Sequence, residues 1–440
     1  MHCRSLRLAE TVQLRHNSAD GHPQSQPMKS SADTAWIVER ARSLGFALCG
    51  VVHAEKFPEL DRTAEWLARG YAGEMHYLND PRRADPRTAM PGVRSIIVCA
   101  LNYNSPAPRS VEALHADAAE PRGWISRYAW GRDYHDVLQQ KLRILAAALH
   151  ERFTEPCEAR IYCDTGPLNE RVLAKHAGLG WLGKNTLLLN AKLGSWFFLG
   201  VLLTTLDLSP SLGAVELPPP DLCGSCTKCI DACPTDALVQ PYLMDARLCI
   251  SYLTIELRGS IPENLREPMG RHVFGCDICQ DVCPWNRRAP ATTAEEFQPR
   301  AFSNDRGLAA DAGERHQAEG ALRAASGQTS PSPASDEAKE FRSGESFAEE
   351  EKESLFLPRL AWLVSLSEEQ FRSCFRGSAI KRTKWRGLIR NACIALGNSP
   401  LAMDSAQQQE IRAILTQLSS SAEPAIAESA QWVLSRIESA

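Results

Sequence analysis

The cysteine spacing between Cys223 and Cys283 constrains this chain more than any other feature of its sequence. Eight of the 15 cysteines in the 440 residues fall in this stretch, at short regular intervals. Disulfide scaffolds are typical of short secreted chains, whereas crowded spacings in a long chain indicate ligands to a metal or cluster. The first group reads CGSCTKCIDACP, the C-x2-C-x2-C-x3-C-P pattern of ferredoxins that hold 4Fe-4S clusters.

A second cysteine group, VFGCDICQDVCPW, keeps the last three spacings but has Val273 in place of the first cysteine. In two-cluster ferredoxins the fourth cysteine of each run ligates the other cluster. Cys249 is the candidate within this region for the missing thiolate. A pair of zinc ribbons is the alternative, but both C-x3-C-P endings favour clusters. The predicted ligand sets are Cys223, Cys226, Cys229 and Cys283 for one cluster, and Cys233, Cys249, Cys276 and Cys279 for the other.

Residues 31–215 alternate between helical and strand-like patterns. A helical run, ADTAWIVERARSLGF, precedes the short strand ALCGVV. Further strand-like runs are SIIVCALNY, ARIYCDTG and WFFLGVLLTTL, with helical segments between them. This alternation predicts an α/β domain.

Composition divides the rest of the chain. Residues 1–30 form a polar leader that lacks the apolar core of a signal peptide, and no apolar run is long enough for a membrane span, so we expect a cytoplasmic protein. ELPPPD is a proline hinge before a ferredoxin-like module at residues 216–290. Residues 300–354, rich in small and acidic residues, are expected to be a disordered insertion. Residues 355–440 show short helical patterns that predict a HEAT-like repeat domain.

Four landmarks along the chain resemble a known family. They are ISRYAWGRDYHDVL, CDTGPLNERVLAKHAGLGWLGKNT, the eight cysteines, and GSAIKRTKWRGLIRNACIALGN. Together they resemble the epoxyqueuosine reductases, which are cobalamin-dependent iron-sulfur enzymes that complete queuosine at the anticodon wobble position of tRNA. The resemblance covers roughly residues 31–400, and the leader and the insertion near 302–354 depart from the family pattern.

The resemblance implies that the α/β domain is a cobalamin-binding domain. The bound cobalamin would receive electrons from the clusters. Removal of the epoxide oxygen as water takes two electrons and two protons, so an external low-potential electron donor and a positioned acid are required. The glycines of GLGWLGKNT would let the backbone approach a flat ligand closely. Candidate corrin contacts, each of which could equally be a cap, an ion-pair partner or a core residue, are Arg62, Cys99, Asp133, Asp164, Thr165, His176, Leu179 and Asn190.

Asp133, in the GRDYHDVL stretch, has three interpretations. It could cap the helix that follows, with Asp136 completing a box-like start. A cobalt site of the D-x-H-x-x-G type is a second interpretation, but Leu138 stands where glycine is required. The resemblance implies a third: Asp133 is the catalytic proton donor, provided that burial raises its pKa enough to keep it protonated.

Positive charge is concentrated in the tail, although the whole chain has a formal net charge of -4. No acidic residue occurs from Gln370 to Met403. Solvated helix faces normally mix both signs, so this run predicts phosphate contacts to tRNA carrying epoxyqueuosine. Charge reversal at Lys381 and Lys384 should weaken that binding. The predicted tRNA-binding residues are Lys381, Arg382, Lys384, Arg386 and Arg390.

Three other functions compete with this prediction. Reductive dehalogenases share the cobalamin and two-cluster plan, but commonly carry a twin-arginine export signal that is absent here. A ferredoxin with appended domains would not need the α/β domain or the GRDYH segment. A structural RNA-binding protein would use its clusters only to stabilise the fold, and would pass no electrons to cobalt. For the reductase we expect a monomer.

Overall fold

The computed structural model describes residues 11–12, 28–114, 120–213, 216–302, 353–400 and 406–439. Most of the predicted leader and insertion lies outside these residues. Within them, no helix combines the length and apolar character needed to cross a membrane.

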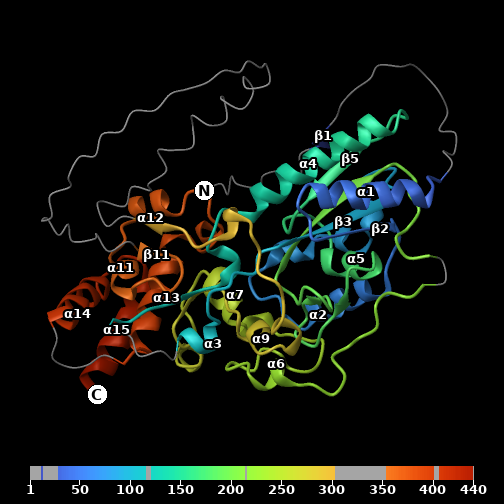
Figure 1. Ribbon diagram of the computed structural model, residues 1–440. Helices are drawn as coiled ribbons and strands as arrows, with labels where there is room; N and C mark the ends of the chain where they lie inside the picture. The colour runs from blue at the N-terminus through green and yellow to red at the C-terminus, as the bar shows by residue number, and fades with distance from the viewer. Residues whose placement is uncertain are drawn as a thin grey trace, which may run out of the picture.

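A five-stranded sheet lies at the centre of the N-terminal half of the molecule (Figure 1). Every neighbouring pair in it is antiparallel. Helices alternating with strands usually accompany parallel strands, so the order and direction of the strands differ from what an α/β pattern favours. The strand order is β1 (Thr11–Val12), β5 (Ala159–Tyr162), β8 (Phe197–Thr204), β3 (Ser95–Asn102) and β2 (Leu48–His53).

Helices cover both faces of this sheet. In Figure 1, α1 (Ser31–Ser43) and α4 (Tyr134–Arg152) lie along one face and α5 (Glu170–His176) lies on the other. Side chains alternate along a strand, so Ile97 of β3 packs in the core beneath α4 and Val98 packs in the core beneath α5. Burial on both faces explains why β3 reads as a continuous apolar run.

The C-terminal region is helical, as predicted, but it shares its core with an earlier part of the chain. One hydrophobic cluster joins Trp124, Trp130 and Phe274 to the apolar side chains of the last five helices. The strand β4 (Trp124–Ile125) pairs in parallel with β9 (His272–Phe274), against which α13 packs. A HEAT-like repeat stays a prediction. The helices are α11 (Leu360–Ser365), α12 (Glu368–Cys374), α13 (Lys384–Gly397), α14 (Ala406–Leu418) and α15 (Pro424–Ser439).

Short elements connect these parts. The helices are α2 (Asp61–Ala68), α3 (Ser110–Ala113), α6 (Lys228–Asp231), α7 (Ile250–Ile255), α8 (Glu263–Arg266) and α9 (Ile278–Asp281). Two antiparallel pairs are β6 (Trp181–Leu182) with β7 (Leu188–Leu189), and β10 (Ala301–Phe302) with β11 (Glu353–Ser354). The 3-10 turn η9 (Ala379–Thr383) precedes α13 and matters for the site.

Candidate active site

Asp133 caps the N-terminus of α4. Its Oδ1 accepts a hydrogen bond from the backbone N–H of His135 at 3.2 Å, which satisfies one of the free donors of the first turn. The backbone N–H of Asp133 donates to the carbonyl oxygen of Gly377 at 2.7 Å. The predicted cap is therefore confirmed, and the loop before η9 is bound to it.

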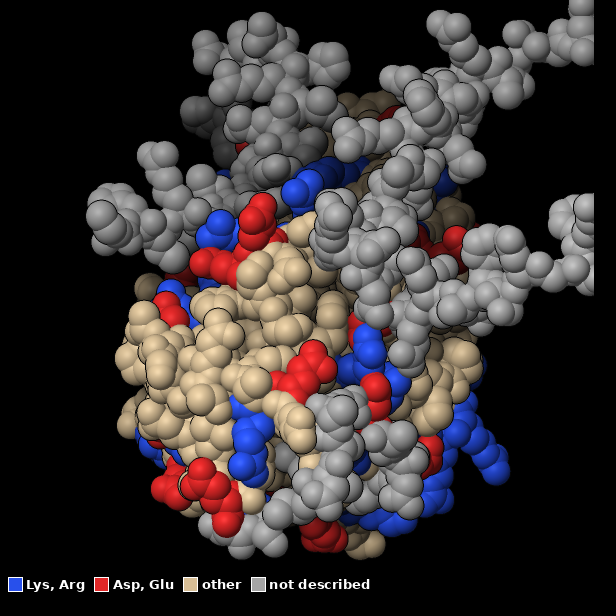
Figure 2. Space-filling model, turned by 90° about the vertical axis from the view of Figure 1, so that its left-hand side faces the viewer, with Lys and Arg blue, Asp and Glu red and all other residues tan. Residues whose placement is uncertain are grey.

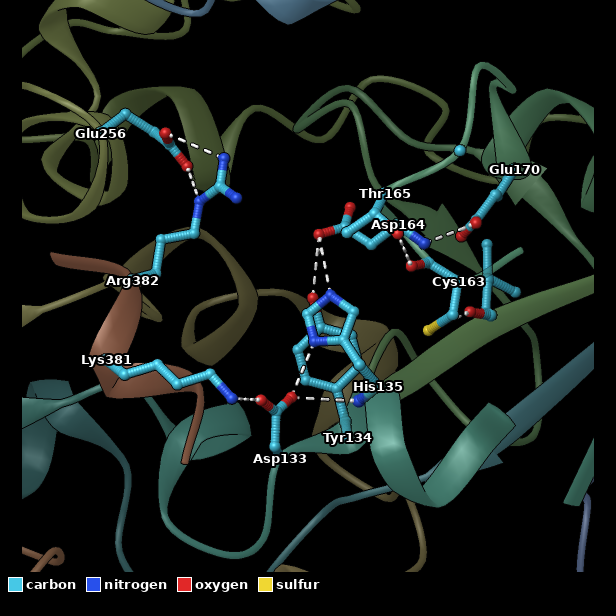
Figure 3. Close-up of polar contacts among 12 residues, drawn as sticks. Asp133, Tyr134, His135, Cys163, Asp164, Thr165, Glu170, Glu256, Lys381 and Arg382 are labelled. Carbon is cyan, nitrogen blue, oxygen red and sulfur yellow. Dashed lines mark hydrogen bonds and ion pairs between the residues drawn. The ribbon is translucent and has the colours of Figure 1, made fainter. Parts of the chain in front are cut away.

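Two cations hold the Asp133 carboxylate (Figure 3). Nδ1 of His135 lies 2.7 Å from Oδ1, and Nζ of Lys381 lies 2.6 Å from Oδ2. Burial raises the pKa of Asp133, but the hydrogen bonds from His135 and Lys381 outweigh it and hold the pKa well below its ordinary value. The condition that burial keeps this acid protonated is not met in this arrangement, because both oxygens have a cationic partner.

His135 lies between two carboxylates. Opposite Asp133, Nε2 of His135 lies 3.7 Å from Oδ2 of Asp164, and this buried nitrogen has no hydrogen-bond partner among the described residues. Burial lowers the pKa of His135, but Asp133 and Asp164 raise it to about 9. The imidazole is therefore a cation at neutral pH.

Tyr134 fixes the orientation of this group. Its ring stacks on Phe198, with an interplanar angle of 2° and centroids 4.3 Å apart, and on His135, with centroids 4.0 Å apart. Its hydroxyl donates to Oδ2 of Asp164 at 2.9 Å. The imidazole and the Asp164 carboxylate are thus held by the same side chain.

The loop after β5 supplies Asp164 and Thr165. Asp164 has a φ of 60°, and its backbone N–H donates to Oε1 of Glu170 at 2.6 Å. Burial, followed by the charge of Asp164, raises the pKa of Glu170 to about 8. The side chain of Asp164 is 68% exposed, so it faces solvent while His135 and Asp133 lie behind it.

The C-terminal region reaches the site through η9. Nε and Nη2 of Arg382 donate to Oε1 and Oε2 of Glu256 at 2.7 and 3.1 Å. The guanidinium lies 5.4 Å from the centre of the Tyr77 ring. Figure 3 shows Lys381 and Arg382 extending from the same turn toward Asp133 and Glu256 respectively. Three distant parts of the chain therefore meet around Asp133.

The eight predicted cluster ligands are free thiols that lie in two groups. Burial and the neighbouring Cys283 and Cys223 raise the pKa of Cys229 to about 11, and Cys283 interacts likewise with Cys223 and Cys226. In the second group, Cys276 and Cys279 both interact with Cys249, and Cys249 interacts with Cys233. Cys279 also interacts with Cys229 of the first group, so the two groups are neighbours. Within the described ranges, no three His, Cys, Asp or Glu side chains lie close enough together to hold a single metal ion.

The GLGWLGKNT segment contacts the cluster loops. Nζ of Lys184 donates to the carbonyl oxygens of Gly224 and Cys226 at 2.6 and 3.0 Å. A Cβ on Gly180 would lie 2.0 Å from the carbonyl oxygen of Leu189, so this glycine permits the β6–β7 pairing. The prediction that these glycines let the backbone approach a flat ligand is wrong for Gly180, because its close neighbour is the backbone of Leu189.

Four of the predicted corrin contacts have other partners. Cys99 is fully buried in the sheet core with its sulfur 3.7 Å from that of Cys49, and Leu179 is a core residue beneath α5. These two are corrected to packing residues, because their neighbours are apolar side chains.

His176 and Asn190 complete that set of four. Nε2 of His176 lies 3.0 Å from Glu59, and its ring stacks on Phe57. The Asn190 side-chain amide donates to the carbonyl oxygen of Leu179 and closes a local turn. Of the predicted contacts, Asp164 faces the side of His135 opposite Asp133, and Thr165 follows it in the same loop. Arg62 is exposed on α2.

The predicted tRNA-binding residues divide into two kinds. Arg390 is 1% exposed, and its guanidinium donates to the carbonyl oxygens of Leu253, Leu257 and Gly259. Its prediction as a surface phosphate contact is therefore wrong.

The other four predicted tRNA-binding residues are exposed. Lys381, Arg382 and Arg386 pair with Asp133, Glu256 and Glu423, which are acids from outside the basic run. Lys384 begins α13 with a φ of 65°.

Comparison with known proteins identifies the family. A family model described as "Epoxyqueuosine reductase QueG, DUF1730" matches residues 83–165, and one described as "4Fe-4S double cluster binding domain" matches residues 222–286. The epoxyqueuosine reductase of Gloeobacter violaceus is 39% identical over 83% of this chain and 96% of its own length. The chain belongs to the epoxyqueuosine reductase family. The Escherichia coli member is 35% identical over 86% of this chain and 84% of its own.

Solved structures of epoxyqueuosine reductases share this fold. One, in complex with an epoxyqueuosine-modified tRNA stem loop, has a TM-score of 0.70 and 28% identity over 92% of this chain and 90% of that chain. The Bacillus subtilis structure, described with an aspartate catalytic loop swung out of the active site, has a TM-score of 0.68 and 28% identity over 92% and 91%.

Several residues of the site were missed from the sequence. Tyr134 stands inside the GRDYH stretch, so its position beside Asp133 was a usable signal. The sequence around Glu170 and Glu256 gave no signal that these residues lie at the site. The partnership of Lys381 with Asp133 was equally hidden, because 248 positions separate them along the chain.

Proposed function

We propose that this protein reduces epoxyqueuosine to queuosine at the anticodon wobble position of tRNA. It is an oxidoreductase of the epoxyqueuosine reductase family. The observation that carries the proposal is the presence, in a chain that spans nearly the full length of such a relative, of both the capped Asp133 site and the double-cluster region. The dehalogenase alternative has no comparable support among the relatives described above.

The iron-sulfur part of the proposal concerns residues 216–290. A region matched by a double-cluster model implies two 4Fe-4S clusters. The grouping of the thiols supports Cys223, Cys226, Cys229 and Cys283 as one ligand set and Cys233, Cys249, Cys276 and Cys279 as the other. Lys184 would hold the first ligand loop against the sheet region.

The residues around Asp133 fit a large polar cofactor such as cobalamin. The side chain of Asp164 is 68% exposed. Surrounding atoms raise its pKa, but the contacts with His135 and Tyr134 outweigh this effect and lower the pKa to about 2. Thr165 and Oδ1 of Asp164 would hold amide side chains of the cofactor, because Oδ2 of Asp164 faces Tyr134 and His135. When bound, cobalamin supplies a cobalt centre able to pass electrons to the substrate.

Asp133 is the proposed proton donor of the reaction. It lies behind His135 with 4% of its side chain exposed. Reduction of an epoxide requires a proton on the departing oxygen, and a buried carboxyl is a suitable donor when it carries one. Lys381 and His135 keep it ionised until then.

The tRNA substrate would be bound by exposed cations near η9 and the start of α13. Lys384 is the strongest remaining candidate, since Lys381, Arg382 and Arg386 each have a carboxylate partner. The face in Figure 2 mixes both signs over a large uncharged surface, and basic side chains gather toward its lower right edge. An external low-potential electron donor, a monomeric state and a cytoplasmic location complete the proposal.

Anaerobic reconstitution tests this function. The protein, loaded with iron, sulfide and cobalamin and reduced, is mixed with tRNA that carries epoxyqueuosine, and the nucleosides are analysed. We expect conversion to queuosine and about eight irons per chain. A fully loaded protein that converts nothing, or a purified protein that binds only zinc, would contradict the proposal.

A further inference from the structure

We propose that Asp133 receives its proton from His135, and that His135 is recharged through the exposed Asp164, so that these three side chains form a relay from solvent to the buried acid. The inference rests on the proposed function and adds the origin of the proton. His135 acts through Asp133, so it is a positioning residue that also stores the transferred proton.

The relay is graded by exposure. The side chain of Asp164 is 68% exposed, that of His135 is 23% exposed, and that of Asp133 is 4% exposed. Asp133 therefore has little direct access to water, and its proton must come from one of its two cationic partners, His135 or Lys381. The contact at 2.7 Å between Nδ1 of His135 and Oδ1 of Asp133 is short enough for transfer.

The other nitrogen of His135 faces Asp164 in a long ion pair. Nε2 is buried, has no hydrogen-bond partner among the described residues, and lies 3.7 Å from Oδ2 of Asp164. A buried polar atom without a partner is unfavourable for folding. A role in exchange with Asp164 accounts for its position, since a small movement of either side chain closes the gap.

Aromatic stacking fixes the ring so that each nitrogen faces a carboxylate. His135 stacks on Tyr134, and Tyr134 in turn lies flat on Phe198. The Tyr134 hydroxyl also holds the Asp164 oxygen that faces Nε2. The geometry is therefore set by contacts that do not themselves carry the proton.

The charges around His135 favour its protonated form. The groups that face it from the surrounding elements are Asp133, Tyr134, Asp164, Glu170, Lys381 and Arg382. The carboxylates of Asp133 and Asp164 contact the ring, whereas Lys381 contacts the far oxygen of Asp133 and Arg382 is paired with Glu256. Burial lowers the pKa of His135, but the two carboxylates raise it to about 9, so the proton is in place at neutral pH.

Each proton transfer breaks one bond and forms another. The N–H bond at Nδ1 of His135 breaks and an O–H bond forms on Asp133. Asp133 then gives this proton to the epoxide oxygen as a carbon–oxygen bond of the epoxide breaks, and the two electrons come from the reduced cofactors that the proposed function already requires. Neutral His135 regains a proton at Nε2 from solvent by way of Asp164, and a second transfer lets the oxygen leave as water.

Two measurements on the holoenzyme test the relay. The first is the single-turnover rate of epoxyqueuosine conversion as a function of pH. The second is residue-resolved deuterium exchange at histidine ring carbons, which gives the pKa of His135 without any substrate. We expect the wild-type rate to fall above pH about 9 and the exchange to give a similar pKa.

His135→Asn is the decisive variant, because its amide can still donate to Asp133 but stores no proton. We expect its rate to fall at least about 100-fold, with the alkaline fall removed from the pH profile. Asp164→Asn should lower the measured pKa of His135. His150→Gln is the matched control, since His150 lies in the last turn of α4 and its Nδ1 lies 2.9 Å from the carbonyl oxygen of Ala146.

The relay is overturned if His135→Asn converts substrate at the wild-type rate, or if His135 titrates at its ordinary pKa of 6.5. The exchange measurement uses wild-type protein, so it decides the point even if the variant does not fold. A fully loaded wild type that converts nothing at any pH refutes the proposed function instead, and the relay falls with it.

Discussion

Lys381 and Arg390 belong to one basic segment of the sequence, yet they lie in different environments. Lys381 extends from η9 with half of its side chain exposed and pairs with the buried Asp133. Arg390 lies on α13 with 1% exposure and bonds three carbonyl oxygens around α7. The first end of the segment therefore completes the site, and the second holds the C-terminal helices to the cluster region.

This difference shows what an unmixed run of charge can mean. The acidic partners were absent from the local sequence but present in space, as Asp133, Glu256 and Glu423. The guanidinium of Arg390 bonds backbone oxygens and the side-chain oxygen of Asn391 instead. A basic stretch can thus serve a site, a core and a surface within a few turns.

Asp133→Asn is expected to have the largest effect at the site end. Asparagine is a good N-cap and can still accept the bond from the His135 backbone, so α4 should form normally. Without the acid, conversion of epoxyqueuosine should fall about 100-fold or more in single-turnover assays. Unchanged iron content and circular dichroism are the controls. Loss of folding would mean that the carboxylate and its two cationic partners serve the fold, and full activity would refute the acid.

Arg390→Met should have the next largest effect, at the core end. The change leaves the carbonyls of Leu253, Leu257 and Gly259 without this donor, and we expect a loss of about 3 kcal/mol in the free energy of unfolding. Chemical denaturation measures it, with the exposed Arg412→Met as control. Normal stability combined with weaker tRNA binding would support Arg390 as a phosphate contact. It would contradict the core role that distinguishes Arg390 from Lys381.

Lys384→Gln should have a moderate effect on substrate binding. Lys384 is exposed at the start of α13, between the two ends of the segment. Loss of one phosphate contact should weaken tRNA binding several-fold and reduce the slope of log affinity against log salt by about 0.7 to 0.9. Titrations at several salt concentrations measure both. An unchanged slope, equal to that of Arg412→Gln, would remove Lys384 from the tRNA-binding surface.

Lys381→Met should have the smallest effect on stability, about 0.5 kcal/mol at neutral pH, because the ammonium is half exposed. The pKa of Asp133 is lowered in the folded protein, so the pair stabilises the fold above the ordinary aspartate pKa of 3.8 and loses this effect as pH falls through the lower folded value. Urea unfolding at pH 5 and pH 8 should therefore show equal losses. A loss that disappears at pH 5 would mean that Asp133 titrates at a higher pKa than its two cationic partners allow.

Local patterns in the sequence predicted their local structures well. The cap at Asp133 and the helix after it are present, and β3 and β8 fall on the SIIVCALNY and WFFLGVLLTTL runs. The cysteine pattern predicted a double-cluster region that a family model also matches. The order and antiparallel direction of the strands were not predictable in this way, because pairing depends on segments far apart in the chain.

The predicted contacts failed where burial decided the role. Cys99 and Leu179 are apolar side chains in regular elements or beside them, and both pack in cores beneath the helices. Their patterns favoured packing, and only the resemblance suggested the corrin. Asp164 stays a candidate corrin contact, because it follows β5 with a positive φ and its side chain is exposed.

The sequence by itself determined the cysteine spacings, the family and the acid at the start of α4, because each depends on residues only a few positions apart. Only the tertiary structure decided the charge state of that acid. Lys381 reaches Asp133 from 248 positions away, and Asp164 approaches His135 from the loop after β5. A pKa depends on distances between charges and on burial, and folding, not local spacing, sets both.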